Sequence, residues 1–103
     1  MAGKPNNLPP SPPGDDWNEV ARRLRELREA LGYERQDKFA EAIGVEPARY
    51  GNAERGLPLS RQLAQKIVEA CPGVQEPWLY RGDIAGLDHE MMKVLGLMPR
   101  PPA

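Results

Sequence analysis

Residues 36–56 read QDKFAEAIGVEPARYGNAERG, and this stretch decides the fold. It contains two short helical patterns separated by Gly44, a residue that tolerates the left-handed backbone with which helices often end. Pro47 suits the first position of the second helix, because its fixed φ is helical and it has no N–H to leave unpaired. The stretch therefore predicts one helix over 36–43, a tight turn, and a second helix that begins at Pro47 and stops at Gly56.

The spacing of small and apolar residues predicts how these two helices meet. Helices that cross at roughly 90 to 120° need a small residue at the contact, a bend between them and apolar contacts beyond it. Four residues meet these needs in order: Ala40, Gly44, Val45 and Tyr50. Three more positions are expected to face inward: Phe39, Ile43 and Ala53. The side chains of Arg49 and Asn52 are then left to project outward.

A longer amphipathic helix is expected before this pair. Apolar residues recur at three- and four-residue steps, which places them on one helix face: Trp17, Val20, Leu24, Leu27 and Leu31. Asp15 or Asp16 can cap the helix, and Gly32 ends it. The opposite face mixes acids with arginines, which is typical of a solvated surface with ion pairs at helix spacing.

Three further helices are expected after the pair. Ser60 can cap a fourth helix, Pro77 can start a short fifth helix, and Asp88 can cap a last one. The fourth carries a continuous apolar stripe: Leu63, Ala64, Ile67, Val68 and Cys71. The last carries an apolar patch that we expect to lie beyond the core: Leu87, Met91, Met92 and Leu95. No stretch alternates with the two-residue period of a strand, so the fold is expected to be all-α.

Proline content divides the chain. Residues 1–14 hold five prolines and the tail 99–103 holds three, so both ends are expected to be disordered arms. We expect one folded domain over 15–83 and a short C-terminal helix over 84–98. Four of its residues are a candidate homodimer contact: Met91, Met92, Leu95 and Leu97.

Composition excludes several classes of function. Of the 103 residues, 28% are charged and 40% hydrophobic, which is ordinary for a globular protein and too polar for a membrane span. The N-terminal segment has no apolar stretch after its lysine, so we expect neither a secretory signal nor a transit helix. We therefore expect a cytoplasmic location.

Cys71 has no second thiol with which to form a disulfide or a zinc site, and is expected to be a small buried hydrophobe. His89 is the only histidine and no phosphate-binding loop is present, so neither an enzyme nor a cofactor is expected.

The chain resembles the Cro and phage repressor class of helix-turn-helix proteins, also called the xenobiotic response element family. The resemblance covers about 20–83 and rests on 36–56 together with three flanking motifs: RELREALG at 25–32, ERG at 54–56 and WLYRG at 78–82. It implies a lambda-repressor-like fold of five helices and a transcription regulator, most often a repressor, that binds a partly palindromic operator on double-stranded DNA as a homodimer. It also implies that Arg28 pairs with Glu54, as a device that positions the second helix of the motif.

The resemblance further implies which residues face DNA. Gln36 would contact a phosphate at the start of one helix, and Pro47, Ala48, Arg49 and Asn52 occupy the positions that contact bases. Because Pro47 and Ala48 can offer only a contact to a thymine methyl, direct reading would depend on Arg49 for guanine and Asn52 for adenine. Either of these two could instead contact phosphate. Arg55 and Arg61 follow, where backbone contacts position the protein without reading sequence, although each could be merely solvated.

Four features depart from the common pattern. An extra residue lies between Gly32 and Gln36, and Arg35 stands where a Ser or Thr cap is usual. Glu46 places an acid where phosphates would lie, and Gly51 in mid-helix suggests the close approach of another backbone. The net charge of -1 is also unusual for a DNA-binding protein. The alternative function is therefore a protein-interaction module of the same fold, such as an antitoxin or adaptor domain.

Overall fold

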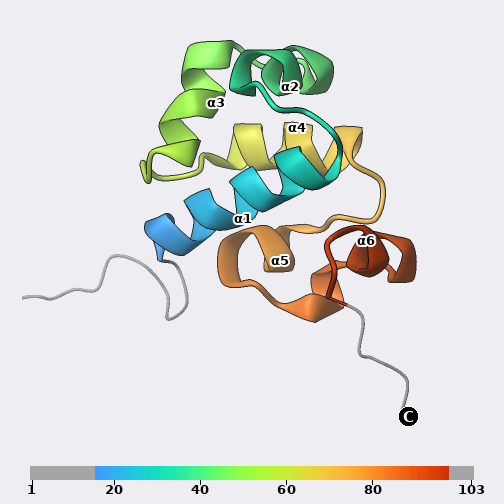
Figure 1. Cartoon of the computed structure of the whole chain (residues 1–103). Coiled ribbons are helices and arrows are strands. Elements are labelled where there is room, and N and C mark those ends of the chain that lie inside the picture. Colours follow the sequence, from blue (N-terminus) through green and yellow to red (C-terminus); the bar gives the residue numbers. More distant parts are fainter. Residues whose placement is uncertain (1–15, 98–103) are drawn as a thin grey trace, which may run out of the picture.

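A computed structural model describes residues 16–97 as a bundle of short helices (Figure 1). The proline-rich arms expected at 1–14 and 99–103 lie outside the described residues. The elements follow in the order α1 Trp17–Ala30, α2 Gln36–Ile43, α3 Pro47–Glu54, α4 Arg61–Ala70, α5 Glu76–Arg81, the 3-10 turn η1 Ile84–Gly86 and α6 His89–Val94. Between residues 16 and 97 the one β-type pairing is an isolated bridge from Val74 to Leu87. The fold class is therefore all-α, with α6 added to five main helices.

Helix α1 forms the central rod on which the other elements pack. The Asp16 carboxylate caps it by accepting a hydrogen bond from the backbone N–H of Asn18 at 3.0 Å. The apolar stripe points into the core, where Val20, Leu24 and Leu27 are fully buried. The helix stops before Gly32, whose φ of +91° is the left-handed conformation that a glycine adopts without strain.

Helices α2 and α3 form the compact pair that the sequence predicts, at one side of α1 (Figure 1). Gly44 ends α2 with φ +79°, and Pro47 occupies the start of α3. Ala40 is fully buried at the crossing, and the Phe39 and Tyr50 rings meet edge to face with centroids 5.2 Å apart. The turn therefore fixes the angle at which α3 projects from the bundle.

Helix α5 is attached to α1 through a buried arginine. Arg23 Nε donates to the carbonyl of Leu79 at 3.2 Å, and its Nη2 donates to the carbonyl of Tyr80 at 3.1 Å. Burial lowers the pKa of Arg23, because removal from water disfavours the charged form. The carbonyls at the C-terminal end of a helix carry partial negative charge, so α5 itself serves as the counter-charge.

The C-terminal segment contributes to the core, contrary to the expectation that its apolar patch lies beyond the core. Leu87 is 7% exposed and Met91 is 6% exposed, while Met92 and Leu95 pack against the core at its edge. The reason is a pair of backbone hydrogen bonds that return the chain to the end of α4, from Gln75 N to the Gly86 carbonyl and from Asp88 N to the Gly73 carbonyl. Such contacts between distant segments are not visible in a helical pattern.

Two further properties of the described residues follow from burial and helix length. Cys71 lies in the core, and burial raises the pKa of its thiol to about 11, so it is neutral at pH 7. None of the helices between residues 16 and 97 combines the length and apolar character required to cross a bilayer.

We expect Met91→Ala to lower the free energy of unfolding by about 2–5 kcal/mol, because it leaves a cavity beneath α6. Val94→Ala is the matched control on the same helix: this side chain is 47% exposed, and the change should stay within about 0.5 kcal/mol. Urea denaturation followed by circular dichroism measures both. Equal, small effects would mean that α6 does not belong to the core.

Candidate nucleic-acid interface

Glu54, the last residue of α3, is the hub of a buried polar network. Its carboxylate accepts hydrogen bonds from Arg28 Nε at 2.7 Å and Nη2 at 3.2 Å, from Gln36 Nε2 at 2.9 Å, and from the Tyr50 hydroxyl. The side chains of Arg28 and Glu54 are only 7% and 1% exposed. Three helices, α1, α2 and α3, thus meet at one carboxylate, which fixes the inner side of α3.

The network keeps Glu54 charged despite its burial. Burial opposes ionisation, but the hydrogen bonds from Arg28, Tyr50 and Gln36 outweigh it, so the pKa of Glu54 lies below its ordinary value. The hydrogen bond to Glu54 raises the pKa of Arg28. Burial, followed by the hydrogen bond to Glu54, raises the pKa of Tyr50, which therefore remains a neutral donor.

Arg28 also holds the loop that carries the extra residue before α2. Its Nη1 donates to the carbonyls of Tyr33 at 3.0 Å and Glu34 at 2.6 Å. Arg35 is the residue before α2 and makes no side-chain capping bond, but pairs with Asp37 in the first turn at 2.7 Å. The loop is thus held by the same guanidinium that binds Glu54, and α2 begins without a Ser or Thr cap.

The outer side of α3 presents a polar stripe to solvent. Ala48 and Arg55 are exposed and Asn52 is half-buried, and their spacing of three and four residues places them on one face. Arg55 Nη2 donates to Asn52 Oδ1, so the two side chains lie against each other. Pro47 is exposed at the start of the helix. This stripe points away from the side fixed by Glu54.

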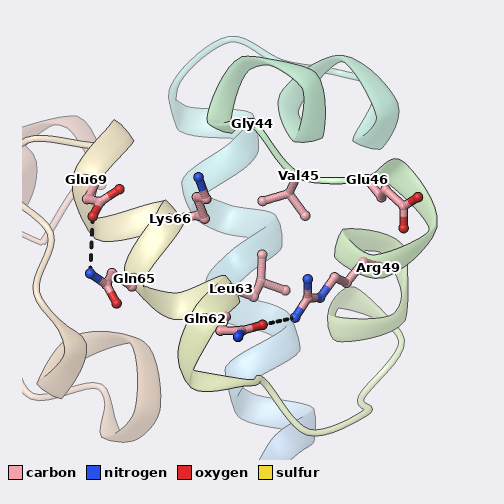
Figure 2. A pocket seen from close by; sticks show the side chains of 9 residues that line it. All are labelled: Gly44, Val45, Glu46, Arg49, Gln62, Leu63, Gln65, Lys66 and Glu69. Carbon is pink, nitrogen blue, oxygen red and sulfur yellow. Dashed lines mark hydrogen bonds between the residues drawn. The ribbon is translucent and has the colours of Figure 1, made fainter.

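Arg49 lies on the flank of α3 and turns towards α4. Its Nη2 donates to Gln62 Oε1 at 2.8 Å, across the mouth of an open cleft of about 570 Å³ between the two helices (Figure 2). Glu46 and Lys66 line the same cleft. Arg49 and Asn52 are thus both accessible but do not share one direction.

Gln36 crosses from the start of α2 onto α3 and lies against Gly51. A Cβ added to Gly51 would lie 3.2 Å from Gln36 Oε1, which is tighter than an ordinary contact. The close neighbour is a side-chain amide, so the expectation that another backbone approaches Gly51 was wrong. One N–H of Gln36 is engaged by Glu54, and the exposed amide retains a second.

The basic residues after α3 lie on the adjoining surface. Arg61 is exposed in the first turn of α4 and lines a shallow hollow with Glu76, Tyr80 and Arg81. Sequence reasoning missed Gln62 as part of this surface. Gln62 lies 13 positions after Arg49, and no motif links the two, because their contact depends on how α4 packs beside α3.

Comparison with known families agrees with this geometry. The family model for the helix-turn-helix matches residues 24–79, which is more than half of the chain. The chain therefore belongs to this helix-turn-helix family, the Cro and phage repressor type, and is a DNA-binding regulator. Comparisons with curated proteins and with solved structures gave no significant match.

We expect Glu54→Gln to lower the free energy of unfolding by about 3 kcal/mol at pH 7, because Arg28 would lose its buried counter-charge. Since the folded pKa of Glu54 is lowered, its ionisation stabilises the fold fully above its ordinary pKa of 4.5 and loses that effect as the pH falls through the lowered value. Urea unfolding between pH 3 and pH 7 should therefore show a flatter acid limb in the variant.

The control is Glu26→Gln, which removes an exposed pair with Arg22. Exposed pairs contribute at most about 1 kcal/mol, so this change should be small and leave the acid limb intact. Identical pH profiles for Glu54→Gln and the unchanged protein would contradict the role of Glu54 as the ionised hub.

Proposed function

We propose that the protein is a sequence-specific repressor of the phage or prophage type, which binds a partly palindromic operator on double-stranded DNA as a homodimer. The observation that carries the proposal is that one side of α3 is fixed to the domain and the opposite side faces solvent. Its inner side is tied to α1 and α2 through Glu54, and its outer side carries the exposed Ala48 and Arg55 and the half-buried Asn52. A helix held rigidly on one side and polar on the other suits insertion into the major groove.

The distribution of charge supports DNA binding despite the net charge of -1. Among the described residues, five basic side chains form ion pairs with carboxylates: Arg22, Arg28, Arg35, Lys38 and Lys93. None of these pairs includes Arg49, Arg55 or Arg61. Since affinity for DNA follows local phosphate contacts, three arginines without carboxylate partners beside α3 favour binding more than the total charge opposes it.

Repression is the simpler regulatory outcome for such a domain. Occupying an operator can block transcription with no further contact, whereas activation also needs a surface that contacts the transcription machinery. The resemblance to phage repressors favours the same outcome. We propose that Gln36 contacts a phosphate and that Pro47 and Ala48 contact thymine methyl groups. Arg49 and Asn52 contact base edges. Arg55 and Arg61 contact the sugar-phosphate backbone of the DNA.

Selection from random duplexes tests the proposal directly. The whole chain should enrich one sequence with two related half-sites, and anisotropy titrations should show an affinity for it that falls steeply with salt. If no duplex is enriched and mixed DNA remains unbound at low salt, the DNA-binding proposal fails. That outcome would favour the alternative, a protein-interaction module of the same fold.

We expect Asn52→Ala to weaken binding to the selected operator by about 1–3 kcal/mol and to relax preference at one base pair in each half-site. Arg61→Ala is the comparison: it should weaken operator and random DNA about equally and reduce the salt slope by about 1. Titrations of each variant on both kinds of DNA measure the difference. An equal loss on both for Asn52→Ala would contradict its assignment to a base.

The homodimer contact is proposed at a hollow that α1, α5, η1 and Leu97 line, with charged side chains of α1 on one side of it. Ile84 is 52% exposed and Leu97 is 41% exposed, and both line one hollow beside Trp78. Two copies joined there would have to present their α3 helices about 34 Å apart, one turn of DNA, to engage both half-sites. Apolar residues that remain exposed in the monomer are the reason for choosing this surface.

We expect the double change Ile84→Ser and Leu97→Ser to shift the mass measured by sedimentation from dimer to monomer, because it removes apolar area from the contact. Binding to a two-half-site operator should weaken, while binding to one half-site should not change. Leu57→Ser, at a side chain 49% exposed in the connection from α3 to α4, is the control for mass. A variant that remains dimeric would place the contact elsewhere.

A further inference from the structure

Arg49 has a base-reading role in the proposed function, and its side chain contacts a residue of another helix. The side chain leaves the flank of the helix and lies beside α4, where its Nη2 donates to Gln62 Oε1 at 2.8 Å (Figure 2). An exposed arginine loses much rotamer freedom when it is ordered, so a fixed partner lowers the entropic cost of binding. We propose that Gln62 is a positioning residue that helps determine DNA sequence preference through Arg49, an inference that rests on the proposed function.

Gln62 is suited to this role because its backbone is firmly held. It lies in the first turn of α4, where the Ser60 hydroxyl accepts from the Leu63 N–H at 3.1 Å. The next two residues, Leu63 and Ala64, are buried at 3% and 0% exposure. Gln62 is thus an exposed amide on a rigid turn, and a hydrogen bond to it ties Arg49 to the core of the domain.

The chemistry of the partner matters as much as its place. Glu46 lines the same cleft, but no ion pair joins it to Arg49 among the described residues. A carboxylate partner would cancel the charge of the guanidinium, whereas the amide oxygen of Gln62 is neutral and leaves that charge in place. The bond uses one of the five N–H donors of the guanidinium, so a pair remains for the O6 and N7 of guanine.

The test compares Gln62→Ala with Gln65→Ala on the selected operator and on operators changed at each base pair. Gln65 is a matched control, because it is an exposed glutamine one turn further along α4 and bonds Glu69 instead of Arg49 (Figure 2). In Gln62→Ala, the ratio of affinities for the selected operator and for an operator changed at one base pair should fall about three- to tenfold, as expected for one lost hydrogen bond. This should occur at the base pair that Arg49→Ala also affects. Gln65→Ala should not change this ratio, and both melting temperatures should stay unchanged.

A double-mutant cycle separates positioning from direct contact. In an Arg49→Ala background, Gln62→Ala should cause no further loss of discrimination; an additive loss would mean that Gln62 contacts DNA itself and would overturn the inference. Gln62→Glu should keep the geometry but weaken binding to all sequences, because it neutralises Arg49. If the unchanged protein selects no operator, the proposed function fails; if it selects one and Gln62→Ala leaves discrimination intact, only this inference fails.

Discussion

The structure depends on one buried charge. Glu54 ends α3, and a carboxylate that is 1% exposed is tolerable only when donors surround it. The donors come from α1 through Arg28, from α2 through Gln36 and from α3 through Tyr50, so the charge is satisfied only when all three helices meet at their native angles. Apolar packing alone would accept small rotations of α3. The buried network does not, and it therefore gives the exposed side of α3 a defined direction.

The network also determines what α3 can carry. Gln36 reaches Glu54 by passing over Gly51, where a Cβ would come within 3.2 Å of its amide oxygen. Glycine inside a helix costs about 1 kcal/mol relative to alanine, and an alanine at this position would require the Gln36 amide to shift by a few tenths of an ångström. Asn52 and Arg55 border this position and bond to each other. Gly51 therefore lies between the buried Glu54 network and the outer pair of Asn52 and Arg55.

Local features were predictable from the sequence, and the family resemblance correctly predicted one distant contact, the pair between Arg28 and Glu54. Other contacts between distant segments were not predictable. Asp16, Ser60 and Asp88 cap their helices as expected, because a cap depends on a side chain and the two or three residues that follow it. Gly44 was equally predictable, since only its own backbone conformation is at issue. The burial of Leu87 and Met91 depends on the chain turning back onto the connection between α4 and α5, and the direction of Arg49 depends on Gln62 of another helix. Amphipathic periodicity indicates which face of a helix is buried, but not which residues of other segments contact that helix.

In a chain with net charge -1, the arginines differ in the chemistry of their hydrogen-bond partners. Arg22 on α1 and Arg35 before α2 are each paired with carboxylates. Arg49 in α3 and Arg55 directly after it instead donate to the amide oxygens of Gln62 and Asn52. An amide orders a guanidinium without cancelling its charge, so these two arginines retain their full attraction for phosphate or guanine. The charges of Arg49 and Arg55 are thus not compensated by carboxylates, whereas those of Arg22, Arg28 and Arg35 are.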